Sequence, residues 1–403
     1  MRTALLSAIR RTDTGDLRAG LMLAGRSVLA WQADWARALG CDRVICLSET
    51  PGEAVLNLQS EIESGGGECL VVKGNLQLAG IVRAEDELVV LMDGLVPDRS
   101  ISDHWQKPGD KLHHAIATLP ADHALASEHP EDFERLDRER RWGGIAVVKA
   151  AQVHKLADMP PDGDAVSMLL RLALQAQVGC KELPRDAFDT GEAVFALAPD
   201  QLARRELSLV EAGSAIPPWS GPGRALASLI VRKVAPKRLA NGVEAGIAVG
   251  ALSLAGGLAL SVWGNAVAAL GLAAVGAFSI AVAGAWSGLR ARLWSIPRNR
   301  LWDLLASPAI DLVVLGILLF SRYFEEGPDA EPSIGLVSMP VIAIGLTHLL
   351  GREPDGAASA WGRDRTTHCA FFAICAAAGY LSEGISIFAL MALGILALSR
   401  KQK

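Results

Sequence analysis

Arginine and aspartate side chains recur in the segment 284–311, which lies between two apolar runs. Residues 264–283 before it and 312–320 after it are almost wholly apolar. Guanidinium groups pair with phosphate through two hydrogen bonds, and carboxylates bind Mg²⁺ or accept a proton from an attacking hydroxyl group. The segment therefore predicts either a phosphate site at a membrane surface or an ordinary positively charged loop. The residues concerned are Arg290, Arg292, Arg298, Arg300, Asp303 and Asp311.

The two aspartates of this segment are spaced to lie on roughly the same face of a helix, because Asp311 follows Asp303 by eight positions. A carboxylate at the start of an apolar run is a functional candidate, and a helix-end or helix-packing role is the alternative. His348 and His368 each lie near the end of an apolar run, and we expect both to be structural.

The chain of 403 residues changes near residue 240 from a mixed, charged half to an apolar half. Its net charge of −5 gives no reason to expect binding to nucleic acid. Its six cysteines show no CxxC pair and no metal-ligand spacing, so we expect reduced thiols. We expect a soluble domain at 1–215, a linker with an amphipathic helix at 216–240, and a membrane domain at 241–403.

Apolar runs follow one another beyond residue 240, and a spanning helix needs roughly 20 mostly apolar residues. Basic residues gather on alternate loops, so the positive-inside rule predicts that both termini and the soluble domain are cytoplasmic. In the linker, residues 224–235 predict a basic amphipathic helix in the plane of the membrane surface, stopped by Pro236. A plain basic flank of the membrane is the alternative. The expected spans, about six in number, are 242–262, 264–286, 305–323, 333–351, 366–382 and 384–399.

Strands and helices alternate in the first half, which predicts βαβ units and a parallel sheet covered on both faces. The run 87–93 is the strongest strand and ends at Asp93. Ligands of such sheets bind at the carboxyl ends of the strands, so Asp93 is a candidate site residue. The expected strands are 3–8, 43–47, 69–72 and 87–93, and the expected helices are 27–39 and 53–64.

This order of elements resembles the nucleotidyltransferase fold of sugar- and polyol-phosphate nucleotidylyltransferases. The resemblance rests on the segments 23–32, 36–44, 89–94 and 143–148. It implies that Gly25 and Arg26 belong to a nucleotide site and that Asp93 is a metal ligand.

Two features of the first half depart from that family. The segment 9–15, where the family has a glycine-rich phosphate loop, contains no G-x-G. The second metal-binding acid is expected shortly before Pro199, where this sequence has alanine or leucine. One carboxylate alone is a poor Mg²⁺ site, so a strand-end or turn role is the alternative for Asp93.

A soluble domain of this kind, a basic interfacial helix and several spans together resemble the CDP-alcohol phosphatidyltransferase family. More closely, they resemble the fused proteins that join a nucleotidylyltransferase to such a transferase in polyol-phosphate phospholipid synthesis. The family motif, D-x2-D-G-x2-A-R followed by G-x3-D-x3-D, lies between the second and third spans. The residues that match it here are Gly288, Ala291, Arg292 and Asp303, whereas Gly284, Ser287 and Ser307 stand in place of acids and Asn299 in place of glycine.

This second resemblance implies two divalent metals held by four carboxylates, the last of which deprotonates the attacking alcohol. Mg²⁺ is therefore the expected cofactor of an active enzyme, with Asp303 and Asp311 as catalytic candidates. Because metal-binding acids are missing from both halves, we expect a catalytically impaired member. An active transferase with a rearranged site is one alternative, and an unrelated transporter with a cytoplasmic regulatory domain is another. The expected phosphate ligands are Gly288, Arg290, Ala291, Arg292, Arg298 and Arg300.

The expected fold is thus an α/β nucleotidyltransferase-like (Rossmann-like) cytoplasmic domain followed by an all-α domain of about six transmembrane helices. The expected setting is a bacterial inner membrane, in which the protein forms a homodimer, contacts the lipid bilayer and binds CDP-diacylglycerol or a CDP-alcohol.

Overall fold

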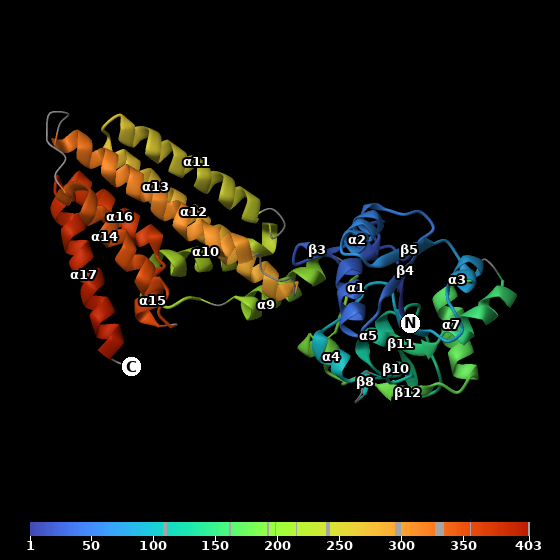
Figure 1. Cartoon of the computed structure of the whole chain (residues 1–403). Coiled ribbons are helices and arrows are strands. Elements are labelled where there is room, and N and C mark those ends of the chain that lie inside the picture. The colour runs from blue at the N-terminus through green and yellow to red at the C-terminus, as the bar shows by residue number, and fades with distance from the viewer. Residues whose placement is uncertain are drawn as a thin grey trace. The chain divides into compact units, whose positions relative to one another are not determined.

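The computed structural model describes residues 1–107, 111–160, 163–191, 193–197, 199–214, 216–238, 242–294, 300–326, 334–354 and 356–401. The chain forms two compact units, Met1–Leu207 and Ser208–Lys403 (Figure 1). The first, here called the α/β unit, is built on strands, and the second, here called the helical unit, contains only helices among its described residues. Each is described by itself.

A seven-stranded sheet forms the centre of the α/β unit, in the order β12-β10-β11-β6-β1-β4-β5. β1 is parallel to β4 and to β6, and β4 is parallel to β5. β11 is antiparallel to both of its neighbours, β6 and β10. The strands are β1 (Arg2–Ser7), β4 (Arg43–Leu47), β5 (Glu68–Val72), β6 (Glu87–Leu91), β10 (Ala115–Pro120), β11 (Arg140–Lys149) and β12 (Gly179–Glu182).

The sheet is therefore mixed, and the prediction of a wholly parallel sheet was wrong on the side of β11. Two adjacent parallel strands need a long crossover, usually through a helix that covers the sheet. The segment between β10 and β11 carries only α5 (Ala124–Glu128), a five-residue helix, and the chain returns antiparallel. The predicted parallel strands 43–47, 69–72 and 87–93 are confirmed to within two residues at each end.

Apolar strands and amphipathic helices build one core in the α/β unit. Leu5 and Ile45 lie on adjacent strands and are fully buried, and burying such a side chain stabilises a fold by about 1.5–3 kcal/mol. Helix α1 (Val28–Ala38) begins after Ser27, whose side chain accepts the Ala30 N–H as an N-cap does. The other helices are α2 (Glu53–Ser64), α3 (Asn75–Ile81), α4 (Arg99–Asp103), α6 (Ala151–His154), α7 (Ala165–Gln175), α8 (Ala187–Thr190) and α9 (Pro199–Gly213), with short η1 (Arg18–Gly20) and η2 (Lys155–Asp158).

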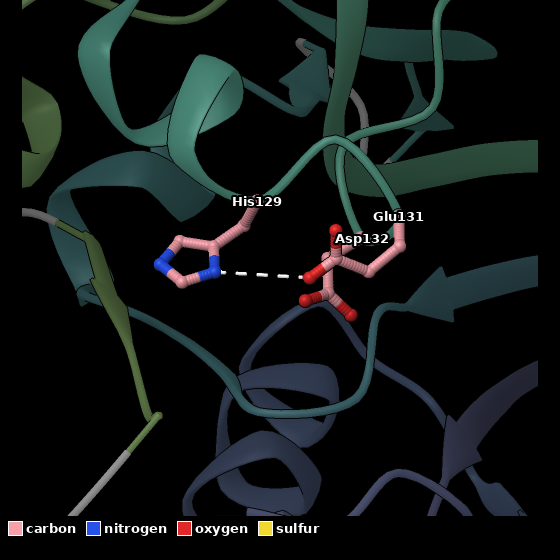
Figure 2. A group of neighbouring side chains, drawn as sticks. All are labelled: His129, Glu131 and Asp132. Carbon is pink, nitrogen blue, oxygen red and sulfur yellow. Dashed lines mark ion pairs between the residues drawn. The ribbon is translucent and has the colours of Figure 1, made fainter. Parts of the chain in front are cut away.

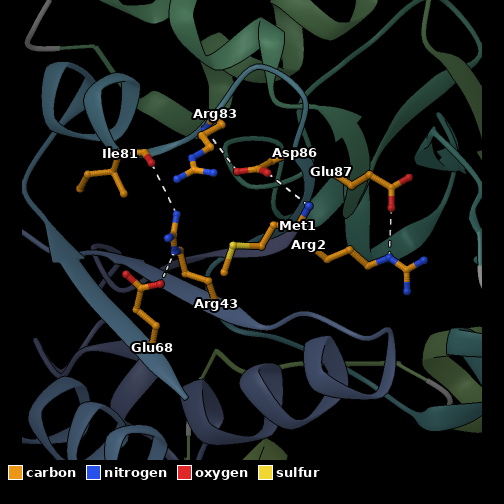
Figure 3. A network of polar contacts seen from close by, with 8 residues as sticks. All are labelled: Met1, Arg2, Arg43, Glu68, Ile81, Arg83, Asp86 and Glu87. Atoms are coloured by element: carbon orange, nitrogen blue, oxygen red, sulfur yellow. Dashed lines mark hydrogen bonds and ion pairs between the residues drawn. The ribbon is translucent and has the colours of Figure 1, made fainter. Parts of the chain in front are cut away.

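Ion pairs close the amino-terminal edge of the parallel strands (Figure 3). Arg2 on β1 donates through Nε to Glu87 on β6 at 3.0 Å, and Arg43 on β4 donates to Glu68 on β5 at 2.6 Å. These contacts tie neighbouring strands together and occupy the charged groups at this edge. Asp93 follows β6 at the opposite, carboxyl edge, where ligands of such sheets usually bind. Figure 3 also draws Met1, Ile81, Arg83 and Asp86.

The helical unit has helices at all six predicted places, but only three are long and apolar enough to cross a membrane in the described part of the chain. They are Gly242–Val262, Ala266–Leu293 and Leu381–Ser399. The described apolar parts of two others, Leu305–Ser321 and Val337–Gly351, are shorter. The helices are α10 (Pro222–Arg238), α11 (Gly242–Val262), α12 (Ala266–Leu293), α13 (Arg300–Glu326), α14 (Ile334–Gly351), α15 (Ala357–Gly362), α16 (Arg365–Ala377) and α17 (Leu381–Lys401).

Among the predicted helix ends in this unit that were wrong are those of α10 and α12. Residues 224–235 are helical, but α10 continues through Pro236 to Arg238, because a proline so close to the end removes only one bond of the last turn. The second expected span, 264–286, continues to Leu293, so arginines 290 and 292 belong to helix α12 and not to a loop. A helix of this length is about 42 Å long and exceeds the thickness of a hydrocarbon core, about 30 Å.

Small residues allow α11 and α12 to pack closely, and both run beside α13 (Figure 1). A Cβ atom added at Gly257 on α11 would lie 2.8 Å from the Ala269 carbonyl oxygen on α12. A Cβ added at Gly250 would lie 3.2 Å from the Gly276 carbonyl oxygen. Helices inside a bilayer associate through such close backbone approach.

A Gly257→Leu substitution should therefore separate α11 from α12. We expect a loss of about 1–3 kcal/mol of stability, the usual cost of forcing extra atoms into a packed core. Thermal unfolding of the full chain in a mild detergent would measure it. Gly271→Leu is the matched control, because a Cβ at Gly271 meets nothing within 4 Å; equal losses in both variants would contradict the close-packing argument.

Candidate functional site

A cavity of about 430 Å³ lies in the helical unit. Its walls come from the end of α9, α10, α12, α13, α14 and the start of α16. Small side chains leave the space: Gly284 and Gly288 on α12 and Ala306 and Ser307 on α13 all line it. A Cβ atom added at Gly284 would meet nothing within 4 Å, so this position is open.

The cavity contains part of the segment in which the sequence predicted a site. Gly284, Gly288 and Arg292 line it from α12, and Ser307 lines it from α13. Ala291 is not among its lining residues, and neither is Arg290. Arg290 instead lies 3.4 Å from Glu244 through Nη1 and stacks over the Trp294 ring at 4.5 Å.

Three other predicted site residues fall partly or wholly outside the described part of the chain. Arg298 lies between α12 and α13, outside the described residues. Arg300 and Asp303 lie in the first turns of α13, but their side chains are not described. The motif alignment at Asp303 therefore stays a prediction.

Most of the charge around the cavity comes from arginines that the sequence analysis did not name as site residues. Arg224 comes from α10, Arg352 follows α14, Arg363 follows α15, and Arg365 begins α16. With Arg292, five arginines line the cavity, and none of its described lining residues is Asp or Glu. In the sequence, the excess of basic residues on alternate loops marked most of these arginines. That pattern alone does not distinguish arginines that set membrane orientation from arginines that bind a ligand.

Asp311 is held by Arg365 through two parallel hydrogen bonds. Arg365 Nε donates to Asp311 Oδ1 and Nη2 donates to Oδ2, each at 2.7 Å. The two side chains are 14% and 8% exposed, so the ion pair is nearly buried. His348 Nδ1 lies 3.7 Å from Asp311 Oδ2. Arg365 and His348 line the cavity, whereas Asp311 lies behind them.

Asp364 joins the amino-terminal ends of two helices and is fully buried. Its Oδ2 accepts the Gly223 N–H of α10 at 2.8 Å and the Thr367 hydroxyl of α16 at 2.7 Å. A carboxylate is stabilised there by free N–H groups and by both helix dipoles. Because Arg224 follows Gly223 and Arg365 follows Asp364 in sequence, Asp364 fixes the backbone that carries both arginines at the cavity.

The described residues do not fit a two-metal centre. Three of the four positions at which the motif requires a carboxylate hold Gly284, Ser287 and Ser307, and Mg²⁺ requires hard oxygen ligands, chiefly carboxylates. Asp311 does not supply a replacement, because Arg365 occupies both of its oxygens. The arginines can bind a phosphate group directly.

In the α/β unit, Asp93 lies at the carboxyl edge of the sheet, after β6, and is buried. Its Oδ2 accepts the N–H groups of Ile9 and Arg10, each at 2.7 Å. Burial raises the pKa of Asp93 to about 6, against the lowering effect of these two backbone hydrogen bonds. Two backbone donors of the loop after β1, the segment that holds the phosphate loop in the nucleotidylyltransferases it resembles, are thus bonded to a side chain of the same unit.

A cluster of His129, Glu131 and Asp132, which the sequence did not single out, follows α5 (Figure 2). One ligand atom from each lies within 4.8 Å of the others, and His129 Nδ1 lies 3.8 Å from Glu131 Oε1. The buried Asp132 carboxylate already lies 2.8 Å from Arg18 Nη1, and the Arg18 guanidinium stacks over the Phe195 ring at 5.3 Å. Arg18 therefore competes with any cation for the only buried carboxylate of the cluster.

Gly25 and Arg26, the predicted nucleotide-site residues, form the turn and second strand of a small hairpin, β2 (Met22–Leu23) and β3 (Arg26–Ser27). Ala24 and Gly25 have positive φ angles, 48° and 77°, as a two-residue hairpin turn requires. The Arg26 side chain is buried and pairs with Asp34 on α1 and Glu61 on α2. These ion pairs fasten the hairpin to both helices.

The chain thus combines an α/β unit built on a mixed sheet with a helical unit in whose described residues three helices are long and apolar enough to cross a membrane. Among solved structures, the inositol-1-phosphate CTP transferase from T. maritima is similar to this chain at 14% sequence identity, with a TM-score of 0.34. The match covers 46% of this chain and 86% of that protein. No family model matches the chain, and no curated protein matches it.

Proposed function

We propose that this is a divergent membrane protein of the type that joins a nucleotidyltransferase-like domain to a CDP-alcohol phosphatidyltransferase-like domain. Its helical unit binds a phosphate-bearing head group at the cavity and does not carry out metal-dependent transfer. One observation carries this proposal. Four positions of the transferase motif, Gly284, Gly288, Arg292 and Ser307, line a cavity in which arginines are present and two of the expected acids are replaced by Gly284 and Ser307.

The α/β unit takes part as a scaffold in this proposal. Asp93 is bonded to the backbone of the loop after β1, and Arg26 is bonded to two helices, so each has a structural partner in place of a ligand. In the bilayer, both termini are cytoplasmic, two copies form a homodimer, and CDP-diacylglycerol or a CDP-alcohol is the candidate ligand of the cavity.

The proposal predicts that the full chain in proteoliposomes does not release CMP from CDP-diacylglycerol with Mg²⁺ and a polyol phosphate. The reason is the loss of the carboxylates that would hold the metals. Release should stay within the background of liposomes without protein. Turnover that requires Mg²⁺ and is abolished by Asp303→Ala would overturn the proposal in favour of an active transferase with a rearranged site.

A further inference from the structure

The charge and size of the cavity narrow the chemical class of its ligand. This step rests on the proposed function, in which the cavity binds a phosphate-bearing head group. We infer that the cavity binds a terminal phosphate or diphosphate group carrying at least two negative charges. Arginine guanidinium groups take the place that divalent metals hold in the resembling transferases. The ligand binds equally well when every divalent cation has been removed.

The balance of charge points to a ligand with more than one negative charge. Among its described lining residues the cavity has five arginines and no Asp or Glu, and Asp311, which does not line it, pairs with Arg365. Arg292 donates through Nη1 to the Gly213 carbonyl oxygen at 2.9 Å, a neutral partner that fixes the side chain without cancelling its charge. A phosphodiester, with one negative charge, would match this set less well than a phosphomonoester or a diphosphate.

The guanidinium group of Arg365 is already fixed in position before a ligand binds. It is buried, and its hydrogen bonds to Asp311 and to the Gly362 carbonyl oxygen use Nε–H, one N–H of Nη1 and one of Nη2. A guanidinium group has two N–H groups on each Nη atom, so one on each remains for a phosphate oxygen. Since the planar group is already fixed, little conformational entropy is lost when it binds.

The space agrees with this chemistry. A volume of about 430 Å³ lies within the range of small-molecule sites, about 300–1,000 Å³. Gly284, Gly288 and Ser307 line the cavity, and none of its described lining residues is a carboxylate. An anion that binds beside these three residues is therefore not repelled by the described lining.

The test uses the full chain, purified in a neutral detergent with EDTA, and isothermal titration calorimetry. The probes are inorganic pyrophosphate, short-chain phosphatidate and short-chain phosphatidylcholine. We expect pyrophosphate or phosphatidate to bind in EDTA, with phosphatidylcholine at least about tenfold weaker, because each lost charged hydrogen bond costs at least that factor. Binding of phosphatidate alone identifies a lipid head group, and binding of pyrophosphate alone identifies a soluble ligand.

Variants show whether the bound anion is in the cavity. The double variant Arg292→Gln/Arg352→Gln removes two exposed side chains and should weaken binding at least about tenfold without unfolding the protein. Arg365→Gln should also weaken binding, but it breaks the buried pair with Asp311, so the double variant of exposed arginines carries the test. Arg232→Gln is the matched control, because Arg232 pairs with Glu211 at 2.8 Å and does not line the cavity.

Binding that needs added Mg²⁺ would overturn the inference, and so would a Kd unchanged by the double variant, or no binding of either anion. These results are separate from the test of the proposed function. CMP release with Mg²⁺ would contradict the proposal that the protein does not catalyse metal-dependent transfer. The titration in EDTA tests only whether the cavity binds phosphate without a metal.

Discussion

An Asp311→Ala variant is expected to lose about 3–5 kcal/mol of folding free energy, because it leaves Arg365 buried without its partner. Arg365 is 8% exposed and places two hydrogen bonds of 2.7 Å on Asp311. Few other single substitutions in the helical unit should cost as much. The measurement is equilibrium unfolding of the full chain in mixed detergent micelles, followed by tryptophan fluorescence.

The matched control removes both partners together. Asp311→Leu combined with Arg365→Met replaces the ion pair with apolar side chains and should recover most of the lost stability, since apolar replacements of a buried pair are often neutral. A single Asp311→Ala variant as stable as the wild type would mean that the pair contributes nothing to the fold. Asp311 would then return as a candidate catalytic carboxylate.

The stability of Asp93→Asn relative to that of the wild type should rise by about 2.4 kcal/mol as the pH rises from 4 to 7. Burial raises the pKa of Asp93 from an ordinary value of 3.8 to about 6. A raised folded-state pKa means that the stability associated with protonation is fully present below 3.8 and is lost as the pH rises through 6. Asparagine does not ionise, so the variant should lack this dependence.

Hydrogen exchange of amides in β1 and β6, measured on the full chain across this pH range, would report the opening of the strands that flank Asp93. Rates must be corrected for intrinsic exchange at each pH. Asp122→Asn, at an exposed carboxyl group, is the control and should follow the wild type. If Asp93→Asn also followed the wild type, Asp93 would titrate alike in the folded and unfolded chain.

Much of the α/β unit could be predicted from the sequence because its signals are local. The run 43–47 is apolar over the length of a strand, and the segment 53–64 has helical periodicity and ends at three glycines; both were confirmed with the same bounds. The direction of β11 could not be predicted, because a strand reads the same in either direction. Its direction depends on a connection in which only a short helix forms.

In the helical unit, hydropathy predicted where the helices lie but not how many of them are long enough to cross a membrane. The run 242–262 was confirmed as α11 with the same bounds. The segment 366–382, by contrast, contains α16, which has 13 residues and ends at Ala377. Such a helix is about 20 Å long, too short for a hydrocarbon core of about 30 Å, and composition alone did not reveal where it ends.

The cavity was foreseen only in part, because sequence spacing relates residues on one helix and not residues on different helices. Gly284, Gly288 and Arg292 are spaced by four on α12 and share a face, which the motif resemblance had detected. Arg224 and Arg365 are far apart in sequence and meet at the cavity through Asp364. That buried carboxylate looks in the sequence like any polar residue before a helix.

The described walls of the cavity come from six helices, α9, α10, α12, α13, α14 and α16, and this has a thermodynamic consequence. A ligand that contacts several of these helices binds only while all of them are packed together. Binding therefore stabilises the packed bundle. By mass action, a ligand present at a hundred times its Kd adds about 2.7 kcal/mol to the stability of the bound form. A concentration-dependent rise in the melting temperature can therefore sort candidate head groups before any chemistry is assayed.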